Sequence, residues 1–175
     1  MNKSGLVALA GALTFVAACA TTAPSSPSGA VDVRAEMQQE VNPAMLSIWE
    51  VTNNAMNDVG GIDPAQMDPA KWQQIAEGAD RLAASGHNMA AAEAYIAASP
   101  DNSAVGEGEV PMADVQRYLD SDPRLFGQMA AAFAAHSEKL AEAARNQDAA
   151  TASGLVVEMD GVCESCHARF WYPEA

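Results

Sequence analysis

Aromatic residues are scarce in this sequence, and runs of β-branched residues are nearly absent. Phe, Trp and Tyr make up only 6% of the 175 residues, whereas alanine and methionine are abundant. Alanine and methionine favour helices, and sheets draw mainly on β-branched and aromatic side chains. The composition therefore predicts an all-α protein, and the length suffices for one domain with its own core.

Basic residues are also few. Nine Lys and Arg face 23 Asp and Glu, so the formal net charge is -14, and the basic residues form no cluster. An acidic surface of this kind repels nucleic acid and anionic lipid. We therefore expect no nucleic-acid partner, and we expect partner proteins that carry basic patches.

The apolar run near the N-terminus is too short for an ordinary membrane span. It covers residues 5–16, follows Lys3, and is typical of a secretion signal, which we place at residues 1–20. Its end, Val16-Ala17-Ala18-Cys19, resembles a bacterial lipobox, and plain cleavage after Ala20 is the alternative. Residues 21–30, rich in Ser, Pro and Thr, form a predicted flexible linker before a domain at residues 31–175. We expect export to the bacterial periplasm, with membrane contact only through a lipid on Cys19.

Cysteine occurs only three times in the chain. Cys19 takes lipid or leaves with the signal peptide, so only Cys163 and Cys166 remain. If Cys163 and Cys166 both attach to a cofactor, the chain has no cysteine pair left for a structural disulfide, although the expected periplasmic compartment is oxidising.

Apolar residues at helical spacing predict four long helical segments. They cover residues 31–57, with an interruption at Pro43, then about 69–98, a segment that opens at 123 with its apolar stripe reaching 143, and 149–170, and a short helix covers residues 112–119. Asp68-Pro69 and Asp122-Pro123 have the form of an N-cap followed by proline at the first helical position. Asn42-Pro43 is either a kink or a fresh N-cap. Four such helices with mostly short connections predict an antiparallel four-helix bundle.

The motif Cys163-Glu164-Ser165-Cys166-His167 carries the chemistry. Cys-x-x-Cys-His is the attachment motif for one covalent haem c. On a helix these positions are i, i+3 and i+4, so the two thiols and the imidazole share one face. Cys163 and Cys166 would form the thioethers, and His167 would be the axial iron ligand.

Two other uses of the motif are weaker. A thioredoxin-like Cys-x-x-Cys follows a strand in a βαβ unit, and the sequence predicts no such unit. A structural zinc site needs a fourth ligand, for which only His136 on another segment is available, without supporting spacing.

With this motif on its last helix, the chain resembles the class II c-type cytochromes, which include the cytochrome c′-like four-helix bundles. The resemblance covers roughly residues 31–172 and implies a covalent haem on the C-terminal helix. In that family the histidine is commonly followed by two residues, then by an aromatic residue and then by a basic one. Here Phe170 is in place, but Trp171 stands where the basic residue would be. Related proteins often dimerise, so the resemblance leaves a homodimer open.

The resemblance also directs attention to the start of the first helix. Some family members place a methionine there as the sixth iron ligand and carry electrons, while others leave that position open to NO or CO. Met37 is the candidate distal residue here, Met45 lies deeper in the segment, and both also fit a core stripe. Arg34 is a candidate contact for a haem propionate.

The sequence therefore predicts a periplasm-facing monohaem cytochrome that transfers electrons between redox partners and is not an enzyme. A gas-binding haem protein on the same fold is the alternative within the family. A non-haem envelope binding module, whose cysteines are only a thiol pair, is the alternative from another class.

Overall fold

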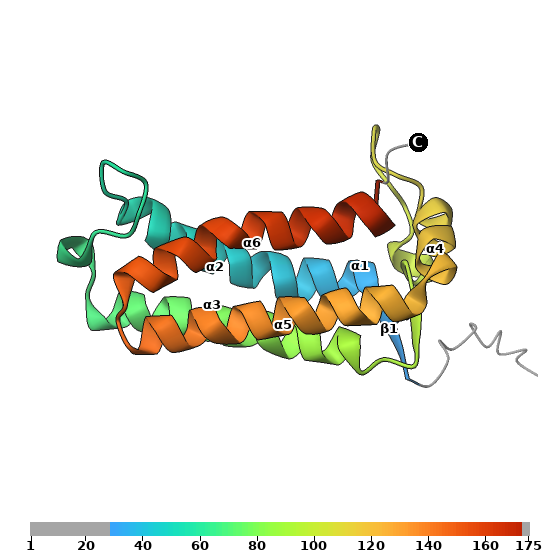
Figure 1. Cartoon of the computed structure of the whole chain (residues 1–175). Coiled ribbons are helices and arrows are strands. Elements are labelled where there is room, and N and C mark those ends of the chain that lie inside the picture. The colour runs from blue at the N-terminus through green and yellow to red at the C-terminus, as the bar shows by residue number, and fades with distance from the viewer. Residues whose placement is uncertain (1–28, 173–175) are drawn as a thin grey trace, which may run out of the picture.

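The structure is a computed structural model that describes residues 29–172, and it is mostly helical (Figure 1). The expectation of a predominantly helical chain is confirmed. The predicted signal peptide and all of the predicted linker but Gly29 and Ala30 lie outside the described residues. The helical elements are α1 (Val33–Glu36), the π-helix η1 (Met37–Val41), α2 (Asn42–Asn54), the 3-10 helix η2 (Pro64–Gln66), α3 (Pro69–Ala90), the 3-10 helix η3 (Pro100–Asn102), α4 (Met112–Ser121), α5 (Pro123–Arg145) and α6 (Ala149–Phe170).

The long helices begin where cap chemistry predicts. The side chains of Asp68, Asp122 and Asp148 each accept a hydrogen bond from a backbone N–H in the first turn of α3, α5 and α6. Pro69 and Pro123 open α3 and α5, where a missing N–H costs nothing. The aspartates therefore satisfy donors that the start of a helix leaves free.

The first helical segment passes through Asn42-Pro43 without a break. Asn42 makes no side-chain cap, and its N–H instead donates to the carbonyl oxygen of Met37, five residues back. Pro43 has no N–H to give to the preceding turn, and a π-turn is one way for a helix to absorb such a gap. The fresh N-cap at Asn42 is therefore wrong, and the helical run continues through a π-turn.

A two-stranded parallel sheet is the element that the sequence did not predict. β1 (Ala30–Asp32) pairs with β2 (Ala94–Ile96), with Val31 opposite Tyr95. The expected helix over residues 69–98 therefore ends at Ala90. The last predicted linker residue, Ala30, lies in β1. The strands are only three residues long and pair across more than sixty positions, so neither has a periodic signal of its own.

Asp32 joins this sheet to the first helix. One carboxylate oxygen accepts the N–H of Ala35 at 2.9 Å and caps α1, and the other accepts the N–H of Ser99 at 2.7 Å. Gln116 of α4 adds a third link, because its side chain bonds Ala97 N–H and the carbonyl of Tyr95. β1, the start of the helical run and α4 are therefore fixed at one end of the molecule (Figure 1).

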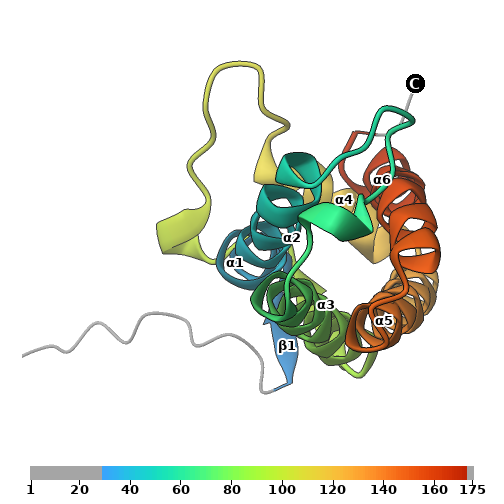
Figure 2. The same ribbon diagram turned by 90° about the vertical axis from the view of Figure 1, so that its left-hand side faces the viewer.

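The helices pack in a ring when viewed from the end (Figure 2). α3 and α5 pack against each other most extensively, α2 packs on α3, and α6 packs on α5. The backbones of α6 and α2 come close at few positions at most. The core is apolar and includes Ile48, Ile75, Leu82, Leu140 and Met159. No helix within residues 29–172 combines the length and apolar character needed to cross a bilayer.

The helices α3 and α5 approach each other closely at Gly86. A Cβ atom built there would lie 2.9 Å from both the Cβ and the N of Ala134, and 3.0 Å from the carbonyl oxygen of Ala130. These are mostly backbone atoms, which cannot turn aside. α3 and α5 therefore need a residue without a side chain at this crossing.

Replacing Gly86 with alanine should destabilise the protein by about 1–3 kcal/mol, because the overpacked crossing must open. Gly154→Ala is the matched control, since no heavy atom lies within 4 Å of a Cβ at that exposed position of α6. It should stabilise the helix by roughly 0.5–1 kcal/mol. Thermal unfolding followed by circular dichroism measures both. Equal effects of the two substitutions would contradict the close crossing.

Candidate haem attachment site

α6 carries the whole Cys-x-x-Cys-His motif within one unbroken helix. Its N-terminus is capped by Asp148, and its C-terminal end is held by Phe170, which is 2% exposed. The Phe170 ring meets the ring of Phe126 from α5 edge-on, with centroids 5.3 Å apart. The motif therefore stands on a helix that is fixed at both ends.

The three chemically important side chains of the motif lie on one side of α6. Cys163, Cys166 and His167 are half-buried, whereas Glu164 and Ser165 between them are exposed. Both cysteines are free thiols that pack against the apolar core. The helical spacing thus places the thiols and the imidazole together, as the sequence predicted.

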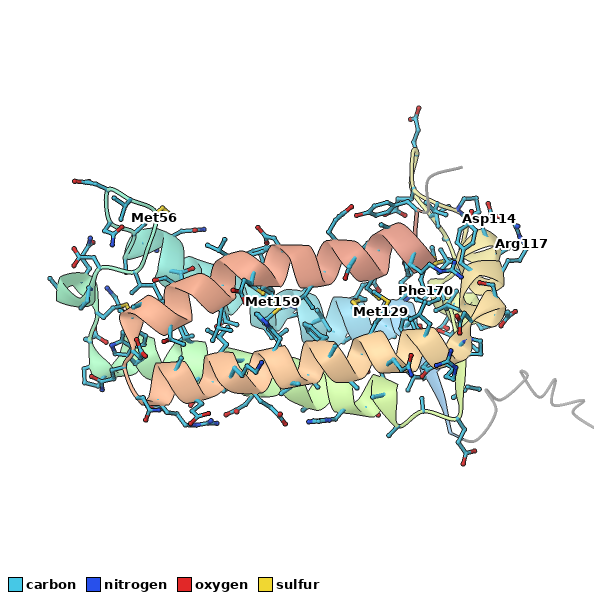
Figure 3. The ribbon with its side chains drawn as sticks, viewed as in Figure 1. Met56, Asp114, Arg117, Met129, Met159 and Phe170 are labelled. Carbon is cyan, nitrogen blue, oxygen red and sulfur yellow. The ribbon has the colours of Figure 1, made fainter. Side chains whose placement is uncertain are left out.

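α6 is less covered than the helices beside it. Of its 22 residues only Ala152, Met159 and Phe170 are buried. Val162 beside the motif is half-buried, and so are Leu155 and Val156, about two turns nearer the start of the helix. Met159 of α6 and Met129 of α5 lie between the two helices (Figure 3). The protein therefore covers the inner side of α6 only in part around the motif.

Burial also sets the protonation of the motif. Removal from water raises the pKa of the Cys166 thiol to about 11, and the neighbouring Cys163 adds to the rise. Burial likewise raises the pKa of Cys163, with a further contribution from the charge of Asp160. Burial lowers the pKa of His167, against the opposing charge of Glu164. At neutral pH the thiols are therefore protonated and the imidazole is neutral.

The residues present fit a covalently held haem. Two protonated thiols on one helical face can both form thioethers with the edge of one porphyrin. A neutral imidazole can offer a nitrogen lone pair to iron. Within residues 29–172, no three His, Cys, Asp or Glu side chains are grouped to hold a bare metal ion. The motif offers a covalently held haem one imidazole nitrogen and two thiols.

Met37 lies at the same end of the molecule as the motif. It is the first residue of η1, is half-buried, and packs against the core. η1 and the C-terminal half of α6 occupy the same end (Figure 1), on different sides of the helical ring (Figure 2). Met45 is 6% exposed in α2. The role of Met37 toward iron stays a prediction.

Arg34 is engaged by the loop between β2 and α4. Its guanidinium donates to the carbonyl oxygens of Asn102 at 3.2 Å and Ala104 at 2.8 Å, and to Glu109 Oε2 at 3.2 Å. The side chain is only 12% exposed. Arg34 therefore holds this loop against α1, and its contact with a propionate stays a prediction.

His136 lies too far along the helix pair to serve the motif. Its Nε2 and the carbonyl oxygen of Leu155 are 2.8 Å apart, so that nitrogen carries the proton and donates. Leu155 and His167 are twelve residues apart on α6, which corresponds to about 18 Å along the axis. His136 therefore joins α5 to α6 rather than completing a metal site.

Sequence reasoning did not connect Glu164 and Tyr172 with the site. After α6 ends, the N–H groups of Trp171 and Tyr172 both donate to the carbonyl oxygen of His167. The Tyr172 ring then lies 5.8 Å from the His167 ring, and its hydroxyl donates to Glu164 Oε2 at 2.9 Å. No sequence motif predicts this arrangement, because it depends on how the chain turns after α6 ends.

Comparison with protein-family models, with curated proteins and with solved structures gave no match for this chain. The assignment of a function therefore rests on the motif, on its place in the fold and on the chemistry of its surroundings.

The thiols of the haem-free polypeptide should react slowly with iodoacetamide. A pKa of about 11 leaves roughly a hundredfold less thiolate on Cys166 near neutral pH than a pKa of 9.0 would. Alkylation should accelerate as the pH rises toward 11, and it should reach the ordinary rate in urea. Peptide mapping by mass spectrometry follows each cysteine separately. Fast labelling of the folded polypeptide at pH 7 would contradict the burial of Cys166.

Proposed function

We propose that this chain is a monohaem c-type cytochrome of the class II kind, exported to the periplasm, that transfers electrons between redox partners. The observation that carries the proposal is the Cys163–Cys166–His167 set on the inner side of the last helix, α6. The proposed architecture is an antiparallel four-helix bundle made of the α1–η1–α2 run, α3, α5 and α6. The ring of helices in Figure 2 and the order of the helix contacts support it.

Each residue of the motif has a defined task. The thiols of Cys163 and Cys166 would each hold the porphyrin by adding across one of its vinyl groups, with a new carbon–sulfur bond and the thiol proton taken up in a new C–H bond. His167 would ligate the iron through an imidazole nitrogen. When bound, the haem supplies a one-electron oxidation–reduction couple. The incomplete cover of α6 leaves apolar side chains beside the motif for the porphyrin to contact.

The protonation of the thiols favours this reading over a redox-active thiol pair. Catalytic Cys-x-x-Cys thiols have a pKa that is lowered by positive charge or a helix N-terminus. Here burial raises the pKa of both thiols, and the motif lies near the C-terminal end of α6. A thiol pair of this kind would be a poor nucleophile, whereas an anchor needs only to be positioned.

The acidic composition supports a choice of partner. With a net charge of -14, attraction to basic patches would steer encounter with a partner protein. Lipid attachment to Cys19 and formation of a homodimer are also part of the proposal, and these two parts rest on the sequence alone.

Covalent attachment is the direct test of the function. In a host that matures c-type cytochromes, the protein should retain haem through acid–acetone extraction, and its mass should exceed that of the polypeptide by one haem. His167→Ala should keep the covalent haem and change the optical spectrum, because the axial bond is lost while the thioethers stay. A wild-type protein with the mass of the bare polypeptide would overturn the proposal.

The sixth iron position separates electron transfer from gas binding. We expect Met37 on the distal side, as ligand or as the residue that blocks the position. Met37→Ala should then convert a low-spin spectrum to high-spin, lower the reduction potential and allow carbon monoxide to bind, since thioether ligation raises the potential.

Met45→Ala is the control for this experiment. Met45 is buried in α2, so its truncation should cost on the order of 2–5 kcal/mol of stability and leave the spectrum unchanged. A wild-type protein that is already high-spin and binds carbon monoxide readily would remove Met37 as a ligand and favour the gas-binding alternative.

A further inference from the structure

The His167 imidazole has two polar neighbours that the attachment motif does not explain. Glu164 precedes it by three positions, so both side chains leave the same side of α6. Tyr172 follows after the helix ends, and its ring returns to within 5.8 Å of the imidazole. The Tyr172 hydroxyl donates to Glu164 Oε2 at 2.9 Å. Tyr172 therefore lies beside both Glu164 and His167 at the end of α6.

The backbone fixes the position of Tyr172. The N–H of Tyr172 donates to the carbonyl oxygen of His167 at 3.0 Å, and the N–H of Trp171 donates to the same oxygen at 2.8 Å. The carbonyl oxygen of His167 thus holds the turn that brings Tyr172 back toward the His167 ring. Half of the Glu164 carboxylate, Oε2, is engaged by Tyr172, and no bond from residues 29–172 occupies Oε1 or a ring nitrogen of His167.

A metal-bound imidazole needs a partner for its second nitrogen. Histidine ligands almost always donate this N–H to a carboxylate, a carbonyl or water, and the acceptor fixes the tautomer and strengthens the ligand. Glu164 is a carboxylate three positions before His167 on α6, and its Oε2 accepts the Tyr172 hydroxyl.

We propose that Glu164 and Tyr172 are positioning residues for the axial histidine. Glu164 accepts the imidazole N–H that does not face iron, and Tyr172 holds Glu164 in place and shields the ring from water. The inference rests on the proposed haem function, and it adds an acidic partner for His167 that the Cys-x-x-Cys-His motif does not specify. A carboxylate in this role increases electron donation from the imidazole, which favours the oxidised iron and lowers the reduction potential.

The test compares three conservative variants of the haem-loaded protein. Glu164→Gln removes the charge but keeps the shape, and Tyr172→Phe removes only the hydroxyl. Glu158→Gln is the matched control, because Glu158 is an exposed glutamate of α6 on a different side of the helix. Spectroelectrochemical titration gives the reduction potential, and NMR of the reduced protein gives the exchange rate of the His167 ring N–H with water.

Glu164→Gln should raise the reduction potential clearly more than Glu158→Gln does, and it should speed ring N–H exchange about tenfold or more. Tyr172→Phe should shift both quantities in the same direction by a smaller amount. If Glu164→Gln does not fold, as judged by its helical circular dichroism, Tyr172→Phe against Glu158→Gln decides the question. Potentials and exchange rates equal to those of the control would overturn the inference while leaving the cytochrome proposal intact. A wild-type protein without covalent haem would overturn both.

Discussion

The crossing of α3 and α5 at Gly86 is the contact on which the rest of the arrangement depends. Because a backbone meets a backbone there, the two helices lie as close as their chains permit. α2 is placed by its packing on α3, and α6 by its packing on α5. The motif is therefore positioned by α5. The two helices are joined by the edge-on contact of Phe126 with Phe170 and by the hydrogen bond from His136 to the Leu155 carbonyl.

Local chemistry made much of this fold predictable. Asp-Pro pairs mark the starts of α3 and α5 because capping and the missing proline N–H act within four residues. The face shared by Cys163, Cys166 and His167 also follows from helical geometry alone. The strand pair, the acceptors of Arg34 and the Tyr172–Glu164 bond were not predictable, because each depends on segments that meet only after the chain has folded. The π-turn at Met37–Val41 was predictable only in part, because Pro43 indicates an irregular helix without specifying a π-turn.

Few residues of α6 are buried, so the stability of the domain would depend on whether the proposed haem is attached. A helix with few buried residues gains little from packing, and most helical stability in proteins comes from such packing. A covalently attached group stays on the chain when it unfolds, so it would stabilise the folded state only through contacts that are lost on unfolding. The half-buried side chains of α6 would supply such contacts to the proposed haem.

The strand β1 determines how a tethered molecule would be oriented. β1 begins at Ala30 and lies at the same end of the molecule as the C-terminal half of α6 (Figure 1). Ten residues lie between Cys19 and Ala30, and the eleven residue steps that join them span at most about 40 Å when fully extended. A lipid on Cys19 would therefore keep the motif-bearing end within a short reach of the bilayer, while the turn between α5 and α6 points away. If the proposed function and the lipid on Cys19 both hold, the motif would lie nearer to partners embedded in that membrane than the turn between α5 and α6 does.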